Sequence, residues 1–78
     1  MISIEERLRK AVTSVIAVEE DEFTPRASFV NDFNADSFQL VEIAMNIEDE
    51  FNIRIPHDDM PKLTTVQSVL DYVKGKLE

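Results

Sequence analysis

The sequence contains no cysteine, and this absence excludes several kinds of site at once. Without a thiol, the chain can form no disulfide, no cysteine-based metal centre and no cysteine nucleophile. It also has a single histidine, His57, so a cluster of histidine ligands is excluded, and no Ser/His/Asp arrangement is evident. Any thiol chemistry would need a sulfur from a non-protein group. We therefore expect the chain not to be an independent enzyme.

Long apolar runs are missing as well. No run approaches the roughly 20 residues that a membrane-spanning helix needs. The first ten residues are rich in charge and lack the apolar stretch of a secretory signal. With 78 residues, 44% apolar and 31% charged, the composition fits one globular domain over residues 1–78. We expect a soluble cytoplasmic monomer without a membrane span, with a stability of roughly 5 kcal/mol.

Basic residues are scarce in the middle of the chain. The protein has 8 basic and 16 acidic residues, for a net charge of −8. No lysine or arginine lies between Arg26 and Arg54, whereas six acids do: Asp32, Asp36, Glu42, Glu48, Asp49 and Glu50. Such a charge repels nucleic acids and anionic membranes and favours basic protein partners. The distribution predicts an acidic docking surface and no nucleic-acid partner.

Two helix starts have a capping box. Ser3 and Glu6 precede apolar residues at helical spacing, which predicts a helix over residues 4–16. Asp36 and Gln39 precede a second apolar stripe, which predicts a helix over residues 37–50.

The rest of the chain predicts a third helix, a short turn and a long loop. Thr64 or Thr65 caps the last helix, whose apolar positions extend to Leu77. Residues 57–62 are expected to form one short helical turn, although Pro61 disfavours a regular helix there. Three apolar residues are expected to pin the loop between the first two helices to the core: Phe29, Val30 and Phe33. No strand pattern is evident, so the predicted fold is all-α, a small bundle of three main helices plus a short helical turn.

The segment before the second helix contains the most informative residues. Asp32, Asn34 and Asp36 alternate as in a calcium-binding loop. That loop requires a glycine and a bidentate glutamate where this chain has Ser37 and Ile43, so no metal site is predicted.

Ser37 stands at the first turn of the second helix. A phosphate esterified there would meet the positive end of the helix dipole and unpaired N–H groups. Serine is also common at helix starts, so its position alone favours an ordinary structural role.

A longer run changes that interpretation. Residues 29–42, FVNDFNADSFQLVE, resemble the attachment region of acyl carrier proteins. The similarity continues through IEER at 4–7, EDEF at 48–51, IRIP at 53–56, LTTV at 63–66 and DYV at 71–73. It covers nearly the whole chain, in order and at the right spacing.

Three features depart from the family's usual pattern. Asn34 stands where the family usually has glycine, and asparagine tolerates the left-handed backbone that glycine adopts. Phe38 replaces a usual leucine beside the attachment point. The family's third helix corresponds to the short helical turn over residues 57–62 of this chain. In the family it is normally acidic and free of proline, whereas this chain has His57, Met60 and Pro61 there.

The resemblance implies a covalent arm on Ser37. A phosphopantetheinyl transferase would attach 4'-phosphopantetheine from coenzyme A to the Ser37 hydroxyl, so Ser37 is an attachment point and not a catalytic nucleophile. Asp36 would cap the helix and help to orient the transferase. The arm would carry acyl intermediates as thioesters to the enzymes of fatty acid synthesis.

The resemblance also implies a docking surface and an acyl pocket. Basic patches of synthases, reductases and acyltransferases would dock on seven residues: Phe38, Val41, Glu42, Met45, Glu48, Asp49 and Glu50. For Val41 and Met45, core packing is the alternative. Eight core residues would line an acyl pocket: Phe29, Phe33, Ile47, Ile55, Met60, Leu63, Val69 and Tyr72. The alternative functions are a specialised carrier for polyketide, peptide or lipid-modification pathways, or an unmodified acidic adaptor.

Overall fold

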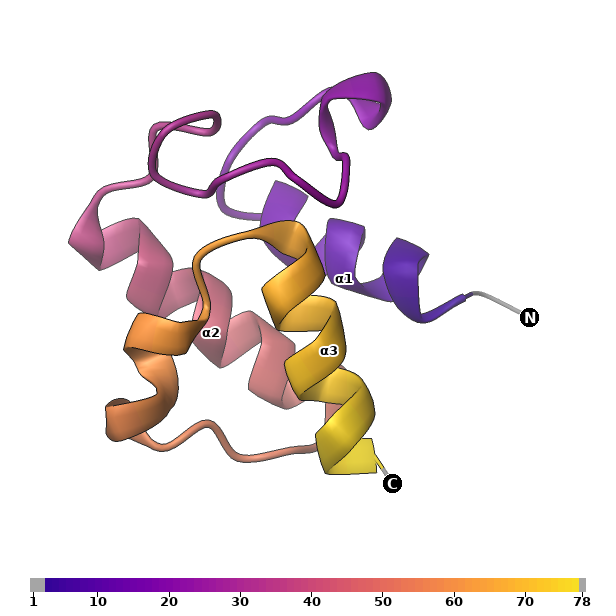
Figure 1. The fold of residues 1–78 in the computed structure, drawn as a ribbon, viewed down its shortest axis with the longest axis vertical. Helices are drawn as coiled ribbons and strands as arrows, with labels where there is room; N and C mark the ends of the chain where they lie inside the picture. Colours follow the sequence, from indigo (N-terminus) through magenta and orange to yellow (C-terminus); the bar gives the residue numbers. More distant parts are fainter. Residues whose placement is uncertain (1–2, 78) are drawn as a thin grey trace.

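The computed structural model describes residues 3–77 and contains three α-helices and two short 3-10 helices. In chain order these are α1 (Ile4–Thr13), η1 (Glu20–Glu22), α2 (Ser37–Phe51), η2 (His57–Lys62) and α3 (Val66–Leu77). The only β pairing within these residues is an isolated bridge between Ser28 and Thr65. The predicted all-α bundle is confirmed (Figure 1).

The capping signals place the helix starts. The Ser3 hydroxyl accepts a hydrogen bond from the Glu6 N–H at 3.2 Å, and α1 begins at Ile4, directly after Ser3. Asp36 accepts from the Gln39 N–H at 2.8 Å, and Gln39 in return accepts from the Asp36 N–H at 3.1 Å. Each bond satisfies an amide that has no partner within its helix. The start of α2 is therefore set locally by the sequence around Ser37.

Two helix ends differ from the predicted ones. α1 ends at Thr13, and the turn after it is tighter, since the Val15 N–H donates to the Val12 carbonyl at 3.0 Å, while the Ser14 hydroxyl donates to the Ala11 carbonyl at 2.9 Å. The prediction that this helix continues to residue 16 was wrong. α2 extends one residue beyond the prediction, to Phe51, and closes at Asn52 with φ 53°. Asparagine is one of the few residues that occupy this left-handed conformation readily.

The start of α3 and both 3-10 helices are also local structures. Thr65, and not Thr64, provides the cap, since its hydroxyl accepts from the Ser68 N–H at 3.2 Å. η2 covers the residues predicted for the short turn, with Pro61 inside it. η1 was not predicted.

The core lies between the three α-helices, with α1 packed on both α2 and α3. The largest fully buried side chains come from all three helices and from the long loop: Phe29, Leu8, Ile47, Val12, Val66, Val69 and Val73. Burial of these apolar side chains is the main favourable contribution to folding. Within residues 3–77 no helix has both the length and the apolar character needed to cross a bilayer.

The long loop between α1 and α2 crosses the end of the bundle where α2 and α3 begin (Figure 1). Phe29 and Phe33 are buried, as predicted, and their rings meet edge to face with centroids 5.6 Å apart. Val30 is 53% exposed, so the prediction that it pins the loop was wrong. It lies inside a tight turn in which Asp32 accepts from the Ser28 N–H at 2.6 Å.

Backbone hydrogen bonds hold this loop to the start of α3. The Phe29 N–H donates to the Thr64 carbonyl at 3.1 Å, and the Val66 N–H donates to the Ala27 carbonyl at 3.0 Å. The loop therefore reaches α2 from a fixed position, and it delivers Ser37 to one end of the core.

Candidate functional site

Ser37 is the first residue of α2 and is exposed. The chain has five serines, and in four of them the hydroxyl is hydrogen bonded within a cap, a turn or a helix end: Ser3, Ser14, Ser28 and Ser68. The Ser37 hydroxyl makes no hydrogen bond with any other residue of the range 3–77. It is therefore the serine whose oxygen is free to react.

The electrostatics around Ser37 suit a phosphate group. The amide dipoles of a helix point their positive end toward its first turn. That turn carries no acidic residue in α2, whereas the first turn of α1 carries Glu5 and Glu6. The neighbouring Asp36 has one carboxylate oxygen engaged in the helix cap. A phosphodiester on Ser37 therefore fits the residues that surround it.

The backbone before Ser37 contains a left-handed residue. Asn34 has φ 56°, which confirms the expected tolerance of asparagine at this position. The next residue, Ala35, is buried and donates its N–H to the Phe29 carbonyl at 2.9 Å. This reversal turns the chain from the core outward, and it leaves Ser37 at the surface.

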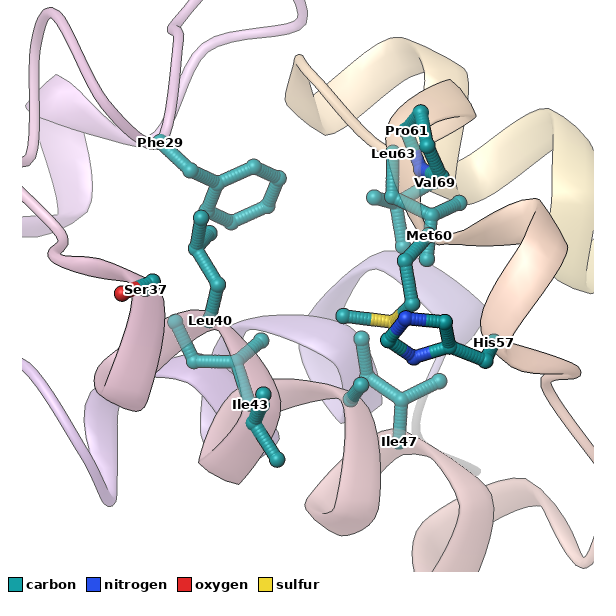
Figure 2. A pocket seen from close by; sticks show the side chains of 12 residues that line it. Phe29, Ser37, Leu40, Ile43, Ile47, His57, Met60, Pro61, Leu63 and Val69 are labelled. Carbon is teal, nitrogen blue, oxygen red and sulfur yellow. The ribbon is translucent and has the colours of Figure 1, made fainter.

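An apolar cavity of about 270 Å³ opens beside Ser37. Twelve residues line it: Phe29, Ser37, Leu40, Val41, Ile43, Ala44, Ile47, His57, Met60, Pro61, Leu63 and Val69. Figure 2 shows Leu40, Ile43 and Ile47 in a row along α2, with Ser37 beside one end of the row. The imidazole of His57 lies beside the other end, next to Met60. The cavity therefore runs along α2, between α2, η2 and α3.

Five of the eight residues predicted for an acyl pocket line this cavity: Phe29, Ile47, Met60, Leu63 and Val69. Ile55 lines a smaller hollow of about 150 Å³ next to it. Phe33 lies outside because its ring stacks on Phe23 at 6.0 Å. Tyr72 lies outside because its hydroxyl is directed to Asp59.

Sequence reasoning missed six further lining residues: Leu40, Val41, Ile43, Ala44, His57 and Pro61. Three of them, Leu40, Ile43 and Ala44, lie on the inward side of α2 that was recognised only as core, and Val41 was predicted only for docking. Helical periodicity shows which side chains face inward, but it does not show which of those face a void.

The outward face of α2 carries exposed apolar side chains between acids. Phe38 is 73% exposed, Val41 48% and Met45 57%, so neither Val41 nor Met45 is a core residue. Glu42 and Asp49 are exposed on the same helix. Their spacing of three and four residues places these five side chains on one side of α2.

Two of the predicted docking acids are engaged within the protein. Glu48 is half-buried and accepts a hydrogen bond from the Ile55 N–H at 2.8 Å. Glu50 pairs with Arg7, whose Nε lies 2.8 Å from the Glu50 carboxylate. These contacts orient Glu48 toward the link after α2 and Glu50 toward α1. The outward acids of α2 are therefore Glu42 and Asp49.

One polar contact joins η2 to α3. The Tyr72 hydroxyl donates to Asp59 at 2.6 Å, and Lys62 lies 3.3 Å from the other carboxylate oxygen. The Tyr72 bond, followed by the Lys62 contact, lowers the pKa of Asp59 below its ordinary value. Partial burial, followed by the bond to Asp59, raises the pKa of Tyr72 to about 12. Both shifts favour the protonation states that keep this contact.

Within residues 3–77 no three potential ligands converge on a point where a metal ion could bind. The alternating acids near Ser37 serve separate turns. Asp32 accepts from the Ser28 N–H, and Asp36 caps α2.

A comparison with known protein families gives a match over most of the chain. A family model described as "Phosphopantetheine attachment site" matches residues 6–73. The matched range includes Ser37, all residues that line the cavity, and the outward face of α2.

Proposed function

Since the chain belongs to the phosphopantetheine attachment-site family of acyl and peptidyl carrier proteins, and so bears a covalent 4'-phosphopantetheine arm, we propose that Ser37 is the attachment residue. The observation that carries this proposal is the free, exposed hydroxyl of Ser37. The hydroxyls of the other four serines are engaged in hydrogen bonds, and those of Ser14 and Ser68 donate a proton that an ester would lack. The first turn of α2 has no acid to repel the phosphate.

The residues around Ser37 have distinct roles in this proposal. Asp36 and Gln39 fix the helix start, so that the hydroxyl is presented to the transferase in one orientation. The arm supplies a terminal thiol that holds an acyl group as a thioester, which is the sulfur that the sequence lacks. Ser37 itself takes no part in later acyl transfer.

The cavity beside Ser37 is the proposed shelter for the acyl group. Its lining is apolar apart from Ser37 and His57. Each methylene group that leaves water for such a lining contributes about 0.8 kcal/mol, so four contribute roughly 3 kcal/mol. An alkyl chain is therefore the cargo that this cavity suits best, and we propose service in fatty acid synthesis.

The outward face of α2 is the proposed docking surface for the transferase and for acyl synthases, reductases and acyltransferases. Phe38, Val41 and Met45 supply apolar contacts, and Glu42 and Asp49 supply charge. Complementary charge mainly raises the rate of encounter and makes it sensitive to salt. Docking of this kind is brief, as a carrier that visits several enzymes requires.

The attachment is tested by the intact mass of the protein. The unmodified chain is incubated with coenzyme A and a promiscuous phosphopantetheinyl transferase. Wild type and Ser14→Ala are expected to gain one arm, and Ser37→Ala none. Ser14→Ala is the matched control because it removes a serine hydroxyl at the end of α1. An arm on Ser37→Ala would refute the assignment, and no arm on wild type would leave an unmodified acidic adaptor.

The docking surface is tested by reversing charge. Glu42→Lys and Asp49→Lys are each expected to slow transfer of the arm several-fold at low salt, and less at high salt. Glu5→Lys on α1 is the control, since Glu5 is also exposed. Equal rates for all four proteins at low salt would exclude docking on this face.

The exposed aromatic side chain of Phe38 beside Ser37 favours one second candidate, a specialised carrier for polyketide, peptide or lipid-modification pathways. The mass of the cargo on protein purified from its own cell distinguishes the two. Saturated straight-chain acyl groups support fatty acid synthesis, whereas branched, aminoacyl or polyketide groups support the second candidate.

A further inference from the structure

The 3-10 helix η2 forms one wall of the cavity and is held less firmly than the other walls. It contributes His57, Met60 and Pro61 to the lining, and Figure 2 shows Met60 and His57 close to Ile47. None of the six residues of η2 is buried. α2 lines the cavity with three buried side chains, and α3 with the buried Val69. Short segments with few buried contacts open at lower free energy than packed helices.

One side-chain hydrogen bond in the described range connects η2 to another helix. The Tyr72 hydroxyl, on α3, donates to the Asp59 carboxylate at 2.6 Å. Lys62 also contacts Asp59, but it belongs to η2 itself and so adds no link to the bundle. Hydrogen bonds to a charged partner are stronger than those between neutral groups. Tyr72 therefore holds η2 against the rest of the protein.

The space that η2 covers is larger than the cavity alone. The smaller hollow of about 150 Å³ shares Val41, Ala44, His57 and Met60 with the main cavity. His57 and Met60 both belong to η2, so an outward movement of η2 would join the two spaces. Met60 has a flexible side chain that adapts to such a change.

Building on the proposed function, we propose that Tyr72 is a positioning residue that sets the length of acyl chain the cavity accepts. It does so by holding Asp59, and with it the η2 wall. A short chain fits while the Tyr72–Asp59 bond is intact. A longer chain needs the joined space, and it enters only when that bond breaks. The Tyr72–Asp59 hydrogen bond thus makes the carrier discriminate between acyl chains by length.

Three variants separate this role from general stability. Tyr72→Phe keeps the ring and removes the hydroxyl. Asp59→Asn keeps an oxygen that accepts the Tyr72 hydrogen bond but loses the charge, so it is expected to retain more of the wild-type behaviour than Tyr72→Phe. Gln67→Ala is the control, because it removes an exposed side-chain bond to Asp71 on the same helix without touching η2.

The first measurement needs no arm and no cargo. Hydrogen exchange of the Asp59 and Leu63 amides, which donate to the Pro56 and Met60 carbonyls, reports the opening of η2. In Tyr72→Phe we expect exchange at these amides to be about tenfold faster, with exchange at the Leu40 amide of α2 unchanged. The neutral apolar dye N-phenyl-1-naphthylamine should also bind Tyr72→Phe several-fold more tightly than wild type. Equal exchange rates, a uniform increase across all helices, or equal dye binding would overturn the proposal.

The second measurement uses loaded carriers. The resistance of octanoyl and hexadecanoyl thioesters to hydroxylamine is compared for each variant. Tyr72→Phe should raise the ratio of hexadecanoyl to octanoyl protection at least threefold, while Asp59→Asn and Gln67→Ala stay within about twofold of wild type. An unchanged ratio in Tyr72→Phe overturns the proposal. If wild type acquires no arm, the proposed function fails instead, and the exchange and dye measurements still decide the role of Tyr72.

Discussion

Arg7 joins α1 to the end of α2, and its replacement should measurably destabilise the protein. Its Nε lies 2.8 Å from the Glu50 carboxylate, and its Nη2 donates to the Glu50 carbonyl at 2.5 Å. The guanidinium also lies over the Phe51 ring, 4.6 Å from the centroid. A single planar group thus makes an ion pair, satisfies a carbonyl near the end of a helix and covers an aromatic ring. Lysine cannot reproduce this geometry.

The expected loss follows from these contacts. Arg7 and Glu50 side chains are each 36% exposed, so their ion pair contributes only about 0.5 kcal/mol. The bond to the carbonyl contributes about 1 kcal/mol, and the contact with the ring about 0.5 kcal/mol. Arg7→Gln should therefore lose about 2 kcal/mol of the free energy of unfolding, and Arg7→Lys about 1 kcal/mol. For a domain of this size, 2 kcal/mol corresponds to a fall in Tm of roughly 10 °C.

Urea unfolding followed by circular dichroism at 222 nm measures these losses. Lys10→Gln is the control, since Lys10 is on α1 but takes part in neither ion pair of residues 3–77. We expect it to change stability by less than about 0.5 kcal/mol. A loss of similar size in Arg7→Gln and Lys10→Gln would refute the reasoning. So would equal stability of Arg7→Lys and wild type.

The structure also predicts three other responses. The protein has one tyrosine and no tryptophan, so tyrosinate absorbance should report a pKa for Tyr72 of about 12 in folded protein, against about 10 in urea. Because folding raises the pKa of Tyr72, its hydroxyl contributes stability that is complete below about pH 10 and is lost as pH rises through 12. A titration midpoint near pH 10 in the folded protein would contradict the contact with Asp59. Asn52 has φ 53°, so in urea titrations Asn52→Gly should raise the free energy of unfolding slightly and Asn52→Ala should lower it by about 1 kcal/mol. Equal free energies for the two variants would show that the left-handed conformation carries no strain. Ile47→Ala, at a side chain 1% exposed, should lose about 3 kcal/mol of the free energy of unfolding, and a loss below about 1 kcal/mol would show that neighbouring side chains move to fill the space.

Local sequence was sufficient for the helix starts and for the backbone around Ser37. A capping box acts over four residues, so Ser3 with Glu6 and Asp36 with Gln39 could be identified without any tertiary contact. That Asn34 tolerates a left-handed backbone was inferred from its residue type at a position where the family usually has glycine. The C-terminal end of α1 was less predictable, because apolar periodicity continues past Thr13 while the backbone changes to a tighter turn there.

For the candidate site too, some features could be predicted from the sequence and others depended on the tertiary structure. The sequence alone indicated a carrier with its arm on a serine at a helix start, since this interpretation depended on several motifs that follow one another in order along nearly the whole chain. Tertiary structure decided which acids are available to partners and which core residues face a cavity. Arg7 and Glu50 are 43 residues apart, and Tyr72 and Asp59 are 13 apart. Side-chain contacts of such separation are created only by the packing of helices, and no periodicity along one helix reveals them.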